Sequence, residues 1–375
     1  MFLRPAPAVS SARAPSGPPD VVVDCNGGFD TTTIQAAIAR APDRGWIEVH
    51  PCTYDERIDF RGKTLWIASS GGAAVTEIDA GGNGTAVTAR GGEGDRTALV
   101  GFTIDDANGQ AVDVRLSALR LQDVVITDTD GSYAIHAQSS DVELANVTID
   151  DSNDAWLHTI ESDRGSITIR GGTFECGTGD GLFTGHGGFI VDGATILCPG
   201  DTAIEVEHAV GRIQRSVLTG DLDVLTEEDH DDDVIRVEDT TLDGDTAVSF
   251  GTFTFRNAIT SGTLSFTDVA DTVTIENSVF TGAGCAIDSN SVLGPIRYND
   301  FSNGPSTCQA VNLVGVDGNF AAATLFVDPA AGDFHLQAGS PLIDAGVPEA
   351  AYRDVDGTRN DLGIFGGHFS QDGGW

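Results

Sequence analysis

The hydrophobic positions of this chain recur with a period of about 22 residues. Short stretches that end in a large apolar residue alternate with runs of Gly, Asn, Asp and Ser. The end residues follow at steps of 22, 23, 25, 22, 22 and 24, and they are Ile104, Ile126, Ile149, Phe174, Ile196, Leu218 and Leu242. A second apolar stretch recurs between them, centred at Val112, Ile135, Leu157, Ile204 and Val248. The pattern predicts two short strands in every repeat, separated by turns.

A period near 22 with β-branched anchors indicates a solenoid, in which each repeat buries its apolar face against the next. A leucine-rich horseshoe would need Leu-x-x-Leu-x-Leu spacing and an Asn or Cys ladder, and the chain has neither. We therefore expect an all-β, single-domain parallel β-helix with about 22 residues per coil.

The cysteines fit the same register. Cys176 and Cys198 occupy one repeat position in successive repeats, and stacking would place their Cα atoms about 5 Å apart, within disulfide range. Disulfides persist in oxidising compartments, so such pairs favour an exported protein. The expected disulfides are Cys25–Cys52, Cys176–Cys198 and Cys285–Cys308.

The two ends depart from the repeat. Residues 31–45 have apolar side chains at helical spacing before a Pro-Asp stop, which predicts a short helix that closes the first coil. Residues 1–20 have no apolar stretch of signal-peptide type and are expected to be a disordered Pro/Ala/Ser tether. The β-helix with its N-terminal cap is expected over 21–325, and an irregular C-terminal cap and tail over 326–375.

Residues 33–69 resemble the opening of bacterial secreted right-handed parallel β-helix repeat proteins of the pectin-lyase-like superfamily. Residues 334–346 and 354–367 resemble the closing segments of many secreted members. With the repeats, the resemblance covers about residues 20–367. It implies a right-handed coil and a secreted or cell-surface, polysaccharide-associated protein. It does not imply catalysis, because a fold does not fix a function.

The charge narrows the range of partners. The chain has 20 basic and 57 acidic residues, a formal net charge of −37, which disfavours binding to nucleic acids and to anionic membranes. No stretch reaches the roughly 20 apolar residues of a transmembrane helix. A polysaccharide is the expected partner, and the oligomeric state is left open.

Motifs of the superfamily's enzymes are present only in fragments. Gly185-His186-Gly187 matches one polygalacturonase motif, but the paired carboxylates that inverting hydrolysis needs are missing from the neighbouring repeats. Gln110-Ala111-Val112 echoes a pectin methylesterase motif, with Asp128 or Asp130 near the distance of that family's first catalytic Asp. Calcium-dependent pectate lysis would need an Asp cluster beside an arginine, and no register-matched Asp triplet stands out.

The repeat register predicts a different candidate site. The residue after each second-strand anchor should face outward, and the coils should stack these side chains in one column about 4.8 Å apart. Two histidines flanked by acids could bind a metal, shuttle a proton or hold a sugar chain. A solvated polar face is the alternative. The predicted column contains Asp113, His136, His158, Phe183 and Glu205.

A calcium ion is the one cofactor suggested by the sequence. Asp354, Asp356 and Asp361 alternate around a Gly turn, as in half of a calcium loop, although the later bidentate Glu is lacking. The acidic run at 227–233 is expected to be an exposed loop with some capacity for cations.

These features predict an extracellular or cell-surface β-helix module that binds polysaccharide or serves a structural or adhesive role. The alternative is a carbohydrate-active enzyme, a polysaccharide lyase, hydrolase or pectin-esterase-like protein acting on a uronic-acid polymer.

Overall fold

The computed structural model describes most of the chain in two compact units, residues 1–189 (unit 1) and 190–375 (unit 2). The predicted tether at its first 14 positions and the acidic run 227–233 lie outside the described residues, and so do the side chains of 158 and 159. The described ranges are 15–150, 158–177, 179–225, 234–249, 251–269, 272–290, 293–309 and 311–367.

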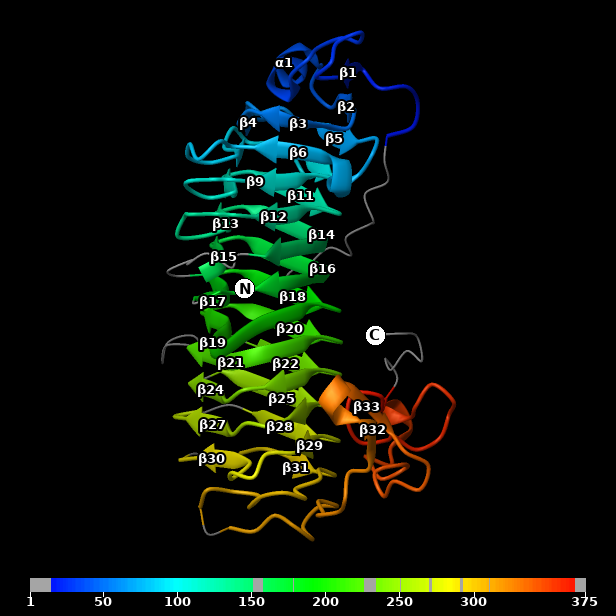
Figure 1. The fold of residues 1–375 in the computed structure, drawn as a ribbon. Helices are drawn as coiled ribbons and strands as arrows, with labels where there is room; N and C mark the ends of the chain where they lie inside the picture. Colours follow the sequence, from blue (N-terminus) through cyan, green and yellow to red (C-terminus); the bar gives the residue numbers. More distant parts are fainter. Residues whose placement is uncertain are drawn as a thin grey trace. The chain divides into compact units, whose positions relative to one another are not determined.

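Unit 1 is a stack of coils whose strands form three parallel ladders (Figure 1). Ladder A contains β1 (Val21–Val23), β2 (Trp46–Val49), β5 (Trp66–Ser69), β8 (Ala98–Val100), β11 (Ala118–Gln122) and the first parts of β14 (Asp141–Asp150) and β16 (Ser166–Glu175). Ladder B contains β3 (Cys52–Asp55), β6 (Thr76–Asp79), β9 (Thr103–Asp105), β12 (Val125–Thr127) and the second parts of β14 and β16. Ladder C contains β4 (Ile58–Asp59), β7 (Val87–Ala89), β10 (Val112–Arg115), β13 (Ile135–Gln138), β15 (His158–Asp163) and β17 (Asp180–Gly185).

Unit 2 repeats the three-ladder plan, and β18 (Gly188–Asp192) lies at the boundary in sequence. One ladder contains β20 (Val210–Gln214), β22 (Val234–Glu238), β25 (Thr252–Arg256), β28 (Val273–Glu276) and β31 (Ile296–Arg297). The second contains β19 (Thr195–Glu207), β21 (Val217–Leu225), β23 (Thr241–Asp243), β26 (Ile259–Thr260) and β29 (Val279–Phe280). The third contains β19 and β21 again with β24 (Thr246–Ser249), β27 (Leu264–Thr267) and β30 (Ile287–Ser289).

The predicted fold class, a parallel β-solenoid with about 22 residues per coil, is confirmed. In ladder B the predicted anchors Ile104, Ile126, Ile149 and Phe174 align in consecutive strands, and each is at most 1% exposed. Burial of each such side chain contributes roughly 1.5–3 kcal/mol, which explains why the apolar period specifies the coil.

The Gly, Asn and Asp residues between strands are explained by the backbone of the turns. Gly101, Asp123, Asn146 and Gly171 occupy the same turn in four successive coils, and all have φ between 52° and 76°. Glycine, asparagine and aspartate adopt this left-handed conformation most readily. Asn146 also donates a hydrogen bond from Nδ2 to Oδ1 of Asp123, at 2.8 Å, so one turn is tied to the next.

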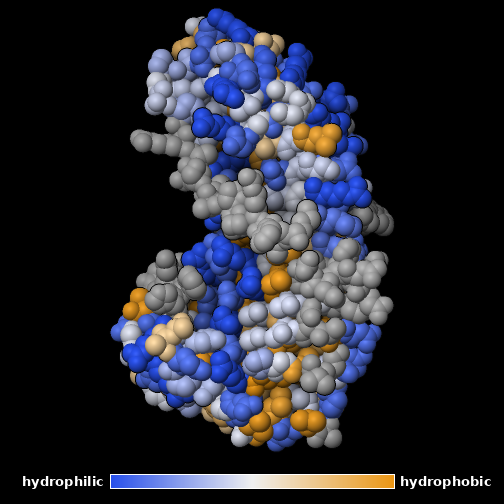
Figure 2. Space-filling model, turned by 180° about the vertical axis from the view of Figure 1, so that it is seen from behind, coloured by the Kyte–Doolittle hydropathy of each residue, from blue (hydrophilic) through white to orange (hydrophobic). Residues whose placement is uncertain are grey.

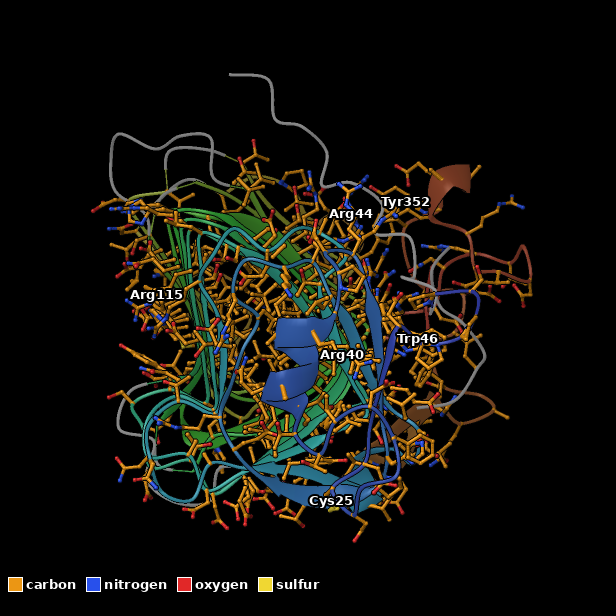
Figure 3. All side chains as sticks on the ribbon, turned by 90° about the horizontal axis from the view of Figure 1, so that it is seen from above. Cys25, Arg40, Arg44, Trp46, Arg115 and Tyr352 are labelled. Carbon is orange, nitrogen blue, oxygen red and sulfur yellow. A yellow bond between two sulfur atoms is a disulfide. The ribbon has the colours of Figure 1, made fainter. Side chains whose placement is uncertain are left out.

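The predicted N-terminal helix is α1 (Ile34–Arg40), and it covers the open end of the first coils (Figure 3). Ile34 and Ile38 of this helix are fully buried. Thr33 caps its start by accepting a hydrogen bond from the Ala36 amide at 3.2 Å. At its other end Lys63 donates to the carbonyl groups of Ile38, Ala39 and Ala41 at 2.7–3.0 Å.

The disulfide predictions hold for the cysteines with described bonds. Cys25–Cys52 and Cys285–Cys308 are disulfides, with Cα–Cα distances of 6.4 and 5.0 Å. Cys176 and Cys198 are disulfide-bonded as well, and no cysteine is free in the described part of the chain.

The C-terminal segment packs on the side of unit 2 rather than over its last coil. Its antiparallel hairpin, β32 (Phe326–Asp328) and β33 (Asp333–Leu336), lies beside the lower coils (Figure 1). Ile259 and Val279 share a core with the buried Leu342, Leu362 and Ile364 of this segment. Short 3-10 turns are η1 (Ala73–Val75) in unit 1, and η2 (Pro329–Ala331) and η3 (Ala350–Tyr352) here.

The surface shown in Figure 2 is largely hydrophilic, with hydrophobic residues in small groups. This agrees with the formal net charge of −37. Among the described residues, no helix is long and apolar enough to cross a membrane.

Candidate functional site

The outer face of ladder C carries a continuous column of side chains in unit 1, and all but the last of them are polar. Alternate residues of each strand, such as Val112 and Ile135, point into the core, so the residues that follow them point outward. The strand register aligns six of these outward residues, which we name the outer column: Asp59, Thr88, Asp113, His136, Glu161 and Phe183.

Three residues of the predicted column, Asp113, His136 and Phe183, lie in the outer column. The register pairs His136 with Glu161 rather than with His158. The inward anchor of β15 is Ile160, three residues beyond the Leu157 that the pattern suggested. The backbone of His158 pairs with Asp180, and its side chain is outside the described residues. Glu205 belongs to unit 2, where it pairs with Asp223.

Asp113 and His136 form a buried acid–imidazole pair at the middle of the column. Nδ1 of His136 lies 2.7 Å from Oδ1 of Asp113. The Asp113 side chain is 0% exposed and that of His136 10%. Both side chains therefore lie on the outward face of the ladder, but neighbouring side chains cover them and keep solvent away.

Two arginines complete the surroundings of Asp113, and we name them the arginine pair. Arg115 donates from Nε to Oδ1 of Asp113 at 3.0 Å, and Arg90 contacts Oδ2 through Nη2. Their side chains are 42% and 46% exposed, so each guanidinium also faces outward, as Figure 3 shows for Arg115. A carboxylate held by two guanidinium groups can accept a hydrogen bond from Nδ1–H of His136, which favours the tautomer protonated at Nδ1.

The electrostatics favour a neutral His136. Burial lowers the pKa of His136 below its usual 6.5, and the positive charges of Arg115 and Arg90 lower it further, against the opposing effect of Glu161. When Nδ1–H of His136 donates its hydrogen bond to Asp113, Nε2 carries the free lone pair. Within the described residues Nε2 makes no hydrogen bond, so it can accept a proton from a ligand.

Tyr133 and Glu161 border the imidazole. The Tyr133 ring stacks on His136 with centroids 5.5 Å apart and an interplanar angle of 27°. Burial, with the hydrogen bond and negative charge of Glu161, raises the pKa of Tyr133 to about 12. The phenol therefore keeps its proton at neutral pH and can act as a proton donor. Spacing within the repeats does not reveal Tyr133, because it lies in the turn before β13.

The Gly185-His186-Gly187 motif has a structural explanation. A Cβ atom on Gly187 would collide with the carbonyl oxygen of Gly165 in the preceding coil, so the turn requires glycine there. His186 has φ 52°, a side chain 48% exposed, and Nδ1 3.6 Å from Oδ1 of Asp163. This is a partly exposed His–Asp contact at a turn, and such contacts contribute little to stability.

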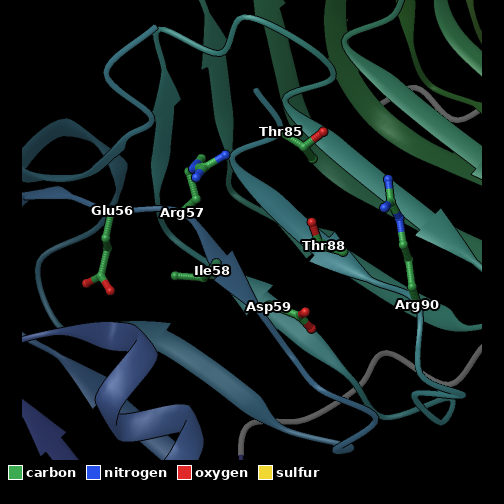
Figure 4. Close-up of a pocket in the computed structure, with 7 residues that line it drawn as sticks. All are labelled: Glu56, Arg57, Ile58, Asp59, Thr85, Thr88 and Arg90. Carbon is green, nitrogen blue, oxygen red and sulfur yellow. The ribbon is translucent and has the colours of Figure 1, made fainter. Parts of the chain in front are cut away.

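A cavity of about 590 Å³ opens at the first strands of ladder C (Figure 4). It adjoins the acid–imidazole pair, because Thr88 pairs with Asp113 in the next strand, and Arg90 both lines the cavity and contacts Asp113. The cavity is lined by Glu56, Arg57, Ile58, Asp59, Thr85, Thr88 and Arg90.

The predicted calcium ligands serve as caps for backbone amides. Asp354 accepts hydrogen bonds from the amides of Asp361 and Gly367, and Asp356 accepts from the amide and hydroxyl of Thr358. In the described ranges, no group of three or more His, Cys, Asp or Glu side chains is placed to hold a metal ion. Calcium at this loop stays a prediction.

Two solved structures that resemble this chain have low sequence identity to it. The pectate lyase Pel9A is 14% identical, with coverage of 89% of this chain and 91% of that chain and a TM-score of 0.49. A pectin methylesterase from carrot is 16% identical, with coverage of 64% and 76% and a TM-score of 0.30. No family profile and no curated protein matches the chain. Neither likeness assigns a substrate or a reaction to this chain.

Proposed function

We propose that unit 1 binds an acidic polysaccharide along the outer column and cleaves it by β-elimination, with His136 as the base. The observation that carries this proposal is the Asp113–His136 pair, which keeps a neutral imidazole on an outward face between two half-exposed arginines. A uronic-acid residue has an acidic proton on C5, next to its carboxylate, and the reaction needs both a base and positive charge at that point.

The chemistry follows from the roles of four side chains. Nε2 of His136 takes the C5 proton, and the electrons of the C5–H bond form the C4–C5 double bond as the C4–O4 bond breaks. The arginine pair offsets the charge that accumulates on the uronate carboxylate. The Tyr133 hydroxyl donates its proton to the departing O4, so each cleavage yields one unsaturated chain end and one new hydroxyl end.

Asp113 is a positioning residue in this scheme. Its carboxylate holds Nδ1–H of His136 and so directs Nε2 outward. It also stabilises the imidazolium that forms when His136 takes a proton, as a buried carboxylate next to histidine does in hydrolytic triads.

An extracellular or cell-surface location is part of the same proposal. The disulfides support it, because such bonds persist in oxidising compartments. A large extracellular polymer also suits an open face of stacked strands better than it would suit an enclosed pocket.

Binding without cleavage is the second candidate, and one observation favours it. The outer column ends at Phe183, a half-buried aromatic ring that stands beside Glu161 on the outward face. Aromatic rings on an open strand face can hold a glycan without reacting with it.

The deciding experiment is an assay of the full chain against a panel of uronic-acid polysaccharides, followed by the ultraviolet absorbance of unsaturated uronate ends. We expect product with at least one polymer, and a loss of about 10²–10⁴-fold in His136→Ala. His335→Ala, in an exposed His–Asp pair of unit 2, is the matched control and should keep full activity. Polymer binding without product would favour the second candidate, and equal activity in His136→Ala would refute the proposed mechanism.

A further inference from the structure

The cavity at the first strands of ladder C has an unusual charge arrangement for so acidic a chain. Two of its lining side chains are cations, Arg57 and Arg90, and two are anions, Glu56 and Asp59. Whether it attracts an anionic or a cationic ligand depends on which of these charges are already engaged within the protein.

The two anions are engaged by backbone donors. Both carboxylate oxygens of Glu56 accept hydrogen bonds from the amides of Ile34 and Gln35, at 2.6 and 2.9 Å. Asp59 accepts from the amide of Arg61 at 2.7 Å. Their charges are therefore partly offset before any ligand arrives.

The cations are less engaged. Arg57 is exposed and makes no hydrogen bond or ion pair within the described residues, although the chain has 57 acidic side chains and 20 basic ones. Arg90 contacts Asp113 through Nη2 and keeps a side chain 46% exposed. Figure 4 shows the two arginines on opposite sides of Thr85 and Thr88.

The geometry points to this cavity as a second subsite for the same acidic polysaccharide, in which Arg57 binds the carboxylate of another uronic-acid residue of the chain. Guanidinium groups bind carboxylates through paired, charge-assisted hydrogen bonds. The hydroxyl of Thr88 faces the same space and can bond sugar hydroxyls. At about 590 Å³ the cavity falls in the usual range for small-ligand sites.

This subsite takes its polymer from the proposed function, but it does not require that the polymer be cleaved. Thr88 lies one strand before Asp113 and two before His136. With strands about 4.8 Å apart, the cavity begins about 10 Å from His136, so a chain that places one uronate at His136 reaches the cavity with a sugar about two units away. Arg57 would then select for acidic polymers at a point where no bond is broken.

The test is calorimetric binding of short uronic-acid oligosaccharides to the full chain, with galacturonate, mannuronate and hyaluronan oligomers as probes. Carboxyl-reduced versions of the same oligomers serve as neutral counterparts. We expect Arg57→Gln to weaken binding of an acidic probe by about 10- to 100-fold. The same change should alter binding of the reduced counterpart by less than about threefold. Arg96→Gln removes an exposed arginine outside the cavity and should change neither.

The outcomes separate the subsite from the reaction. If Arg57→Gln binds every acidic probe as the wild type does, or if no acidic probe binds, the subsite is refuted. If the wild type forms no unsaturated product but its binding depends on Arg57, the subsite stands and the elimination reaction fails. Circular dichroism of Arg57→Gln, together with its binding of the reduced oligomers, shows that any loss is not due to misfolding.

Discussion

Two histidine–aspartate pairs in the described part of the chain have the same 2.7 Å contact and very different surroundings. In unit 1, His136 meets Asp113 across adjacent strands of ladder C. In unit 2, His335 meets Asp333 within the single strand β33. The first pair has side chains 10% and 0% exposed, and the second 56% and 40%.

The difference teaches that a short contact alone does not make a reactive site. Asp113 also contacts Arg90 and Arg115, and burial desolvates the imidazole of His136. His335 stacks on Phe365, with centroids 3.8 Å apart, and its hydrogen bond lowers the pKa of Asp333 in an exposed setting. Solvent screens that second pair, so its two side chains interact more weakly than those of the buried pair.

The largest expected effect is on stability, when each aspartate loses its charge. Asp113→Asn should lower the free energy of unfolding by about 2–4 kcal/mol, because it leaves a buried histidine and two arginines without their counter-ion. Asp333→Asn should change it by less than about 0.5 kcal/mol. Urea denaturation of both variants and the wild type measures this difference. Equal losses in the two variants would remove the distinction between the pairs.

A third aspartate sharpens the comparison by lacking such cation contacts. Asp239, at the turn after β22, is 3% exposed, and within the described residues its Oδ1 has no hydrogen-bond partner. Burial raises its pKa from 3.8 to about 7. The folded protein therefore holds this proton longer than the unfolded chain does, and stability is lost as the pH rises from about 4 through 7.

Asp239→Asn should accordingly raise the stability at pH 8 by roughly 1–3 kcal/mol and have little effect at pH 4. Asparagine also suits the left-handed turn, since Asn257 and Asn277 hold the same position in the next two coils. Thermal unfolding at both pH values is the measurement, with the exposed Asp328→Asn as the control. A gain that is the same at both pH values would contradict the buried-proton explanation.

The smallest expected effect concerns the proton donor. Tyr133→Phe should lower kcat on the cleaved polymer by about 10- to 100-fold with little change in KM, because the ring still stacks on His136 while the departing oxygen loses its donor. Tyr352→Phe, which removes a hydroxyl bound to Glu276 in unit 2, is the control. Unchanged kcat in Tyr133→Phe would assign the proton to another donor.

Sequence periodicity was sufficient for the coil but not for the full site. The anchors of ladder B could be identified because each fills the core at a constant spacing. In ladder C the step from Ile135 to Ile160 is 25 residues, and Leu157 offered an equally apolar anchor nearer the average period. Because of that three-residue shift, Glu161 stands in the column where the sequence pattern predicts His158.

Some of the other site residues can be predicted from the sequence, and others cannot. Arg115 lies two residues after Asp113 in one strand, so alternation alone predicts that they share a face. Tyr133 and the cavity residue Arg57 come from segments outside the strands, and only the folded turns bring them to the column. Burial of Asp113 also could not be predicted, because it results from neighbouring arginines that cover an outward position.

The most direct test of the central claim is the protonation state of His136 in the wild-type chain. Long-range ¹H–¹⁵N correlation spectra across a pH series report both the tautomer and the pKa, with His136→Ala used for assignment. We predict a neutral ring at pH 7, protonated at Nδ1, with a pKa below 6.5. A positively charged ring at pH 7, or a neutral ring protonated at Nε2, would contradict the assignment of His136 as the base.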